Sequence, residues 1–154
     1  MAKHTKEADE MDHKIMREMV RNSNRSYRRL ARDIGLSPAA TIDRIRSLEE
    51  QGMIIGYGAR FDYLKLGFEF MAIVEISISG KDILSIEGKI AKLPAVAAVW
   101  DITGDHDAIA ILMFKTRNEL SGAVKRILAI DGVDKTKTNI VLNVVKRLTE
   151  FDRV

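Results

Sequence analysis

The amino-acid sequence predicts an α+β protein built from two parts with different secondary structure. In the first part, up to residue 52, apolar side chains recur at the three-to-four-residue spacing of amphipathic helices. After residue 67 the pattern changes to strand, helix, strand, strand, helix, strand, which is the order of a ferredoxin-like βαββαβ sheet. The length of 154 residues is enough for one domain or for two small ones.

Three helices are expected in the first part. They cover residues 12–22, with Asp12 as the N-cap, and then 26–35 and 37–52. The last two are joined by the short turn Gly35-Leu36-Ser37, in which the glycine supplies the left-handed conformation that ends a helix. Two helices joined by so short a turn are typical of a helix-turn-helix, and we interpret the first part as a winged-helix-like domain of this kind.

Extended structure is expected after the third helix. Residues 53–62 have the composition of a strand, and 63–67 that of a connector. The later elements are strand 68–79, helix 82–92, strands 96–102 and 108–115, helix 117–129 and strand 134–147. We therefore divide the chain into a helix-turn-helix domain (1–53), a linking strand or hinge (54–66) and a ferredoxin-like domain (67–154).

Two of the predicted strands are apolar on both faces. Residues 108–114 read AIAILMF, and residues 70–74 have the same character. Two helices can cover only one face of such a sheet, so the apolar side chains of the other face need a further partner. We expect a homodimer, or a larger assembly, formed through this sheet.

Positive charge is concentrated on the predicted helix-turn-helix. Between residues 21 and 46 seven arginines stand against two aspartates, a local balance of +5, whereas the whole chain carries only +3. Arginine is well suited to bidentate contacts with phosphate and guanine. A run of charged residues more often marks a solvent-exposed helix face. Here, however, the arginines lie on the two helices that would contact double-stranded DNA. The pattern favours binding to double-stranded DNA.

The helical positions suggest individual roles at the DNA. The recognition helix of the helix-turn-helix is the one predicted for residues 37–52, and its N-terminal, outward part is expected to enter the major groove. Arg44 is the best candidate there for reading guanine. Ala39 and Ala40 permit close approach, and Asp43 must accept from cytosine or pair with an arginine. We expect the phosphates to be held by Arg25, Tyr27, Arg28 and Arg46. The full expected set is Arg25, Tyr27, Arg28, Ser37, Ala39, Ala40, Thr41, Asp43, Arg44, Arg46 and Ser47.

These features resemble a known family. Leu30-Ala31, Gly35-Leu36-Ser37-Pro38, Arg44-Ile45 and Gly52-Met53-Ile54 are similar to the DNA-binding domain of the Lrp/AsnC (feast/famine) transcriptional regulators. Gly104-Asp105-His106-Asp107 resembles a loop of that family's ligand-sensing domain. The resemblance implies a dimer, often an octamer, whose control of transcription responds to a small effector, usually an amino acid.

The loop can also be considered on chemical grounds. An amino acid needs a carboxylate for its ammonium group and N–H groups for its own carboxylate. Asp105 and Asp107 flank His106, but Gly and Asp are equally typical of an ordinary turn, so both interpretations stay open. The effector site that the resemblance implies comprises Thr103, Gly104, Asp105, His106, Asp107, Gly132, Val133 and Thr138.

Composition argues against several other functions. The chain has no cysteine and only three well-separated histidines, so we expect no disulfide, metal centre or cofactor. No apolar run approaches the roughly 20 residues of a membrane span, and we expect a cytoplasmic protein that does not bind membranes. We do not expect an enzyme. Two alternatives stay open, namely an enzyme subunit resembling sirohaem decarboxylase and a module that binds another protein through the helix-turn-helix.

Overall fold

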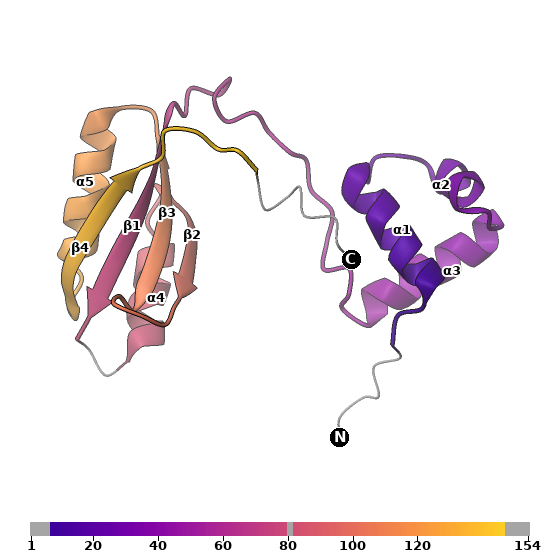
Figure 1. Cartoon of the computed structure of the whole chain (residues 1–154), viewed down its shortest axis with the longest axis horizontal. Coiled ribbons are helices and arrows are strands. Elements are labelled where there is room, and N and C mark those ends of the chain that lie inside the picture. The colour runs from indigo at the N-terminus through magenta and orange to yellow at the C-terminus, as the bar shows by residue number, and fades with distance from the viewer. Residues whose placement is uncertain (1–6, 80–81, 147–154) are drawn as a thin grey trace. The chain divides into compact units, whose positions relative to one another are not determined.

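The computed structural model describes residues 7–79 and 82–146 of the chain (Figure 1). The chain divides into two compact units, one that contains residues 7–60 together with residues 145 and 146, and one that spans Phe61–Val144. The first unit contains three helices, and the second contains a four-stranded sheet with two helices, which confirms the α+β class. No helix in the described ranges is long and apolar enough to cross a membrane.

The first unit consists of α1 (Glu10–Arg21), α2 (Tyr27–Ile34) and α3 (Pro38–Glu50). The start of α1 differs from the prediction, because Asp9 and not Asp12 is the N-cap. The Asp9 carboxylate accepts a hydrogen bond from the Asp12 N–H at 2.9 Å, and the Asp12 carboxylate accepts one from the Asp9 N–H at 3.2 Å. The two aspartates therefore form a reciprocal capping box that satisfies two backbone donors at the start of the helix.

The apolar stripes of these helices meet in one small core. Its fully buried apolar side chains are Ile15, Leu30, Ile34, Ile45 and Leu48. Burying such a side chain stabilises the fold by roughly 1.5–3 kcal/mol, so the core holds the three helices in one arrangement. Periodicity in the sequence predicted this core, because each helix presents one apolar face.

The strand predicted for residues 53–62 is wrong. Between residues 7 and 60 the structure has no strand, and hence no β-hairpin wing. Met53 and Ile54 instead donate backbone hydrogen bonds to the Leu48 carbonyl, at 2.9 and 3.1 Å, and pack against the helical core. A strand needs a neighbour for its backbone hydrogen bonds, and the described part of this unit supplies none.

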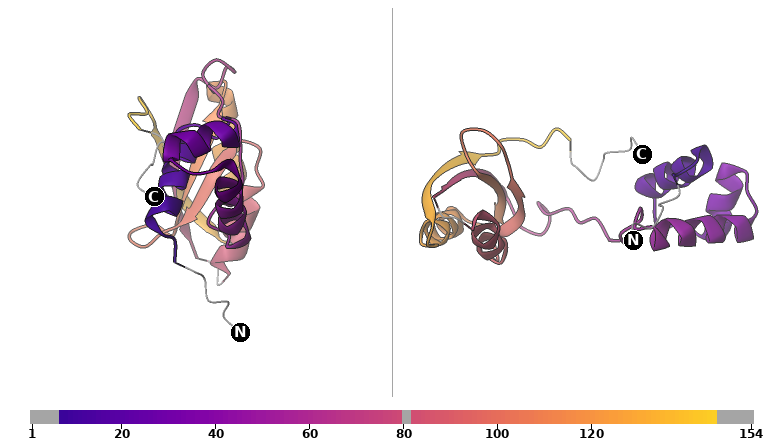
Figure 2. Two further views of the ribbon diagram at one scale, coloured as in Figure 1. Left: turned by 90° about the vertical axis from the view of Figure 1, so that its right-hand side faces the viewer. Right: turned by 90° about the horizontal axis from the view of Figure 1, so that it is seen from below.

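The second unit is a four-stranded antiparallel sheet with the strand order β2-β3-β1-β4. The strands are β1 (Phe70–Ile78), β2 (Val96–Asp101), β3 (Ala108–Phe114) and β4 (Val133–Ile140). Helices α4 (Ile83–Ala91) and α5 (Arg117–Leu128) lie side by side on one face of the sheet (Figure 2). This arrangement confirms the ferredoxin-like prediction. Strand β4 ends earlier than the predicted residue 147, which lies outside the described residues.

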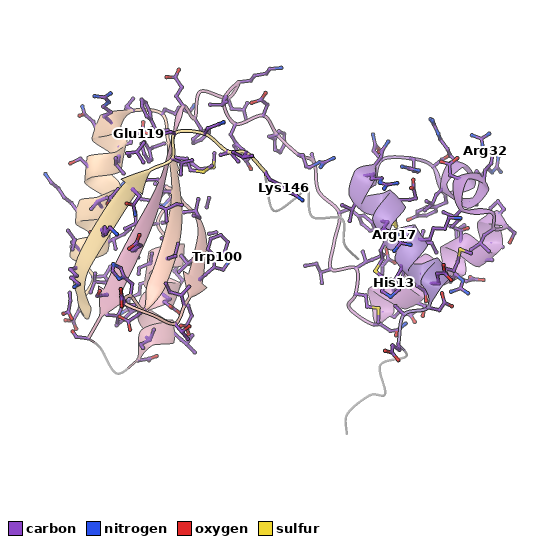
Figure 3. The ribbon with its side chains drawn as sticks, in the orientation of Figure 1. His13, Arg17, Arg32, Trp100, Glu119 and Lys146 are labelled. Carbon is purple, nitrogen blue, oxygen red and sulfur yellow. The ribbon has the colours of Figure 1, made fainter. Side chains whose placement is uncertain are left out.

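The two faces of the sheet differ in burial. On the face covered by the helices, alternate residues are fully buried, for example Val74 and Ile76 in β1 and Leu112 in β3. On the opposite face the side chains are only half-buried and mostly apolar, among them Met71, Ile73, Ile109, Ile111 and Met113. We call this second surface the open face. Trp100 on β2 lies opposite Ile109 on the open face and is 47% exposed (Figure 3).

Candidate DNA-binding surface and effector site

The connection between α2 and α3 is defined by caps, as the sequence predicts. The Ser26 hydroxyl accepts a hydrogen bond from the Arg29 N–H at the start of α2. Gly35 ends α2 in the left-handed conformation, with φ +81°. The Ser37 hydroxyl then accepts from the Ala40 N–H and begins α3, with proline at its first position. These local signals orient α3 relative to α2.

Most of the predicted DNA-binding residues lie on the surface of this unit. The exposed ones are Tyr27 and Arg28 on α2, and Ala39, Asp43 and Arg46 on α3 together with its cap Ser37. Ala40 and Ser47 are half-buried. Two further arginines of α2, Arg29 and Arg32, are also exposed, and Arg32 extends away from the helix (Figure 3). We refer to Arg28, Arg29, Arg32 and Arg46 as the exposed arginines.

Arg25 is bound inside the unit. Its side chain is only 14% exposed, and its Nη1 lies 2.8 Å from Glu18 Oε2 and 3.1 Å from Asp33 Oδ2. Its Nε also donates to the Asn22 carbonyl. The guanidinium therefore joins the end of α1 to α2. The charge pattern of the sequence predicts Arg25 at a phosphate, whereas the structure gives it acidic partners within the chain.

Arg44 is held in a similar way at the other end of α1. Its Nη1 lies 2.7 Å from Asp9 Oδ2 and 2.7 Å from Asp12 Oδ1, the two carboxylates of the capping box. These hydrogen bonds raise the pKa of Arg44, and the hydrogen bond from Arg44 is the main cause that lowers the pKa of Asp9. The sequence predicts a free Arg44 guanidinium at the groove. In this structure the guanidinium instead links α3 to the start of α1.

Thr41 belongs to the core and not to the surface. The side chain is fully buried, and its hydroxyl donates to the Ser37 carbonyl at 3.0 Å. Its expected contact with DNA is therefore wrong for this structure, because Thr41 lies on the buried face of α3 together with Ile45 and Leu48. The sequence also indicated burial, because Thr41 fits the apolar i, i+4, i+7 stripe that it shares with Ile45 and Leu48.

The predicted effector loop is fixed to the end of β1 through Asp107. Its N–H donates to the Ile76 carbonyl at 3.0 Å, and its Oδ2 accepts from the Ile78 N–H at 2.7 Å. Ile78 is also opposite Val133 at the start of β4. The structure therefore brings Asp107 and Val133 to the same end of the sheet. The loop residues 103–105 are exposed there.

His106 reaches the open face of the sheet. Its Nε2 lies 3.1 Å from Glu75 Oε2, and the same carboxylate is bound by Asn139 at 2.8 Å and by Lys137 at 3.4 Å. Thr138 lies opposite Val74 and so points to the helix-covered side. Within one chain, His106 and Thr138 are thus on different sides of the sheet. Glu75 was not predicted as a site residue, although a single charge inside an apolar strand is a usable signal.

Gly132 borders the same end of the sheet. Its carbonyl accepts from the Ser79 N–H at 3.0 Å, and its φ of +91° permits the turn into β4. The neighbouring Asp134 accepts from the Ser79 hydroxyl at 2.8 Å. These contacts fix the start of β4 beside the end of β1. The loop containing Asp107 and the turn at Gly132 therefore flank the end of β1 from its two sides.

Comparison with known proteins gives consistent matches to both units. The model of the AsnC-type helix-turn-helix domain matches residues 9–49, and that of the Lrp/AsnC ligand binding domain matches residues 71–151. The chain belongs to the Lrp/AsnC family of transcriptional regulators. An uncharacterised HTH-type transcriptional regulator of Pyrococcus abyssi is 41% identical over 90% of this chain and 94% of its own.

Two solved structures of similar proteins extend the comparison. A transcriptional regulator of Neisseria meningitidis, determined as a complex with L-Met, is 25% identical and has a TM-score of 0.86, covering 92% of this chain and 94% of its own. Escherichia coli AsnC has a TM-score of 0.84 at 24% identity and shares the fold, covering 94% and 99% of the two chains. Both parts of the chain therefore have the architecture of Lrp/AsnC regulators.

In this Lrp/AsnC chain, Tyr57 connects the segment after α3 to the helical unit. Its hydroxyl donates to Glu49 Oε1 at 2.6 Å. Burial and this hydrogen bond raise the pKa of Tyr57, so the phenol stays protonated as the donor. The residue was not predicted, because a strand was expected over residues 53–62. The contact shows how a non-helical segment packs on the DNA-binding unit.

Glu87 is a second residue that was not predicted. It lies on the inner side of α4, is only 8% exposed, and its Oε1 is buried with no hydrogen-bond partner among the described residues. Burial raises the pKa of Glu87, and the charges of Asp101 and Asp107 raise it further. The sequence signal was weak, because a glutamate in the helical pattern IEGKI is ordinarily solvent-exposed.

Proposed function

We propose that this Lrp/AsnC regulator binds specific double-stranded DNA sequences through α2 and α3. The observation that carries the proposal is the set of exposed arginines on the helix-turn-helix. Within the described part of the chain, no acidic side chain lies within ion-pair distance of these four guanidinium groups. Their side chains therefore remain available for phosphates, which supply most of the affinity of DNA-binding proteins.

The groove-facing residues follow from the exposure of α3. Ser37, Ala39 and Asp43 are exposed in its N-terminal half, the part of a recognition helix that contacts base edges. Asp43 can accept a hydrogen bond from cytosine N4. We assign Arg44 the role of a positioning residue, since it already has two carboxylate partners. Tyr27, Ala40 and Ser47 complete the proposed set of contact residues.

The proposal is tested by selecting bound duplexes from a random-sequence library with the purified full chain. We expect enrichment of a two-fold symmetric motif, because a dimer presents two recognition helices. The variant Asp43→Ala should change the base preference at one position in each half-site. Recovery of no motif, together with no gel shift at low salt, would instead favour a helix-turn-helix that binds another protein.

We also propose that two copies associate through the open face of the sheet. Its apolar side chains are only half-buried within one chain, and burying them against a second copy contributes about 25 cal/mol for each Å². The isologous pairing of identical surfaces makes a closed dimer. The two DNA-binding units of such a dimer would be available for the two halves of one operator.

The effector in this proposal is an amino acid, which acts at the end of the sheet formed by loop 103–107 and the start of β4. Two observations support this assignment. The Neisseria relative was determined with L-Met, and here the exposed loop residues 103–105 adjoin the carboxylate of Asp107. The relatives are named as transcriptional regulators, which favours regulation over the alternative of an enzyme subunit. The proposed place of action is the cytoplasm, where the DNA would be.

A further inference from the structure

The segment that follows α3 has few means of attachment to the helical unit. Its first two residues, Met53 and Ile54, are fixed by backbone hydrogen bonds to α3. Over residues 55–58, the described chain has no further hydrogen bond between backbone groups. The sequence of this stretch is Ile-Gly-Tyr-Gly, and Ile55 is 96% exposed. Because glycine has no side chain, Tyr57 is the residue of this stretch that can hold the segment in place.

Tyr57 makes this attachment through both parts of its side chain. Together with Met16 and Met19 of α1, it lines an apolar groove on the helical unit. Its hydroxyl donates to Glu49 Oε1 at 2.6 Å, in the last turn of α3. A hydrogen bond to a carboxylate is stronger than one between neutral groups. Tyr57 therefore joins the segment to α1 in the groove and to α3 by a charged hydrogen bond.

The same phenol adjoins the first residue of α2, Tyr27. Burial is the main cause of the raised pKa of Tyr57, Glu49 follows, and Tyr27 contributes as well. The phenol of Tyr57 is thus protonated at neutral pH and can act as a donor. Tyr27 belongs to the proposed DNA-contact residues, and both tyrosines are exposed at the surface. The segment, the end of α3 and the start of α2 therefore meet at one hydroxyl group.

We propose that Tyr57 is a positioning residue for DNA binding, which acts through Glu49 on α3 and through Tyr27 on α2. This inference rests on the proposed DNA binding by these two helices and adds a residue that lies outside them. The hydroxyl of Tyr57 fixes the last turn of α3, and its phenol fixes the place at which Tyr27 meets a phosphate. Because the segment continues into the second unit, its position is linked energetically to DNA binding through this contact.

The test is a double-mutant cycle on the affinity of the full chain for the selected duplex, measured by fluorescence anisotropy well below the Tm. Tyr57→Phe removes the hydroxyl and keeps the ring. Glu49→Gln removes the negative charge but keeps a carbonyl oxygen that can accept from Tyr57, whereas Glu49→Ala removes the acceptor as well. Comparing these two variants separates the hydrogen bond from the repulsion between a carboxylate and DNA. The matched control is Tyr63→Phe, at an exposed tyrosine of the second unit.

We expect Tyr57→Phe to bind the duplex at least about fivefold more weakly than the parent chain, because each bound copy loses one hydrogen bond. Glu49→Ala should bind more weakly than Glu49→Gln by the same factor. In the Glu49→Ala background, Tyr57→Phe should have no further effect, since the acceptor is already absent. Tyr63→Phe should bind as the parent does. Melting curves of each variant show that it is folded at the temperature of the binding measurement.

Two results would overturn the inference and leave the proposed DNA binding intact. If Tyr57→Phe keeps the parent affinity, whether or not its Tm falls, the residue does not position the DNA-binding helices. If Tyr57→Phe weakens binding equally in the parent and in the Glu49→Ala background, its hydroxyl acts without Glu49, as a direct contact with DNA would. If the parent chain itself binds no duplex, the inference and the proposed function fail together.

Discussion

Two arginines of α3, two residues apart, have opposite surroundings. Arg44 Nη1 is bound to Asp9 and Asp12, whereas Arg46 is exposed and has no ion-pair partner in the described chain. Sequence spacing alone gives both a similar chance of reaching DNA. The structure separates them into a residue that positions the recognition helix and one that is available to phosphate.

Replacing each arginine with alanine should therefore give different results. Arg44→Ala should lower the Tm of the DNA-binding unit by a few degrees, because the capping carboxylates lose their partner and α3 loses its tie to α1. Arg46→Ala should leave the Tm unchanged and weaken DNA binding. Melting curves and fluorescence anisotropy on one duplex measure the two effects.

The reverse pattern would contradict this assignment. If Arg44→Ala keeps the parent Tm but relaxes the base preference at one operator position, Arg44 reads a base, as its helical position first indicated. Arg44→Lys provides a further check, since it keeps the charge but replaces the guanidinium with a compact, more strongly hydrated ammonium group. It should restore only part of the stability.

At the scale of elements, local patterns predicted most of the fold. The stripe of Thr41, Ile45 and Leu48, the caps Ser26 and Ser37, and the apolar strand β3 all follow from residues close in sequence. The ion pairs were not predictable. Arg44 and Asp9 are 35 positions apart and meet only once α1 and α3 pack. The strand predicted at 53–62 was wrong for a related reason. A strand needs a neighbouring strand for its backbone hydrogen bonds, and the described part of this unit contains none.

Gly35 provides a test at the level of one element boundary. A Cβ at this position would meet no atom within 4 Å, so any cost of Gly35→Ala comes from its φ of +81°. We expect a loss of stability of about 1 kcal/mol, measured by chemical denaturation. Gly88→Ala, inside α4 where the added Cβ also meets nothing, should stabilise the protein instead. Equal effects at both positions would show that the left-handed cap does not matter.

At the scale of the whole molecule, the open face is the feature that one chain leaves incomplete. The variant Trp100→Glu places a charge on this face at a site that is already 47% exposed, so the chain should still fold. We expect it to shift the molecular mass measured by light scattering from dimer or larger to monomer. The matched control Leu84→Glu changes an exposed side chain on α4.

A parent protein that is monomeric at micromolar concentration would contradict the proposed association. So would a Trp100→Glu variant that keeps the oligomeric mass of the parent. In the first case two recognition helices could meet only on the operator. In the second case the chains associate through a surface other than the open face.

The most direct test of the central claim, DNA binding by the exposed arginines, is the salt dependence of affinity for the selected duplex. We predict that affinity falls by more than about tenfold between roughly 50 and 200 mM salt, because binding to phosphates releases counterions. Replacing Arg28 with alanine should reduce the slope of log affinity against log salt by about one for each bound copy, and so by about two for the proposed dimer, since each copy then neutralises one phosphate fewer. Affinity that does not change with salt, or an unchanged slope in Arg28→Ala and Arg46→Ala, would contradict the claim.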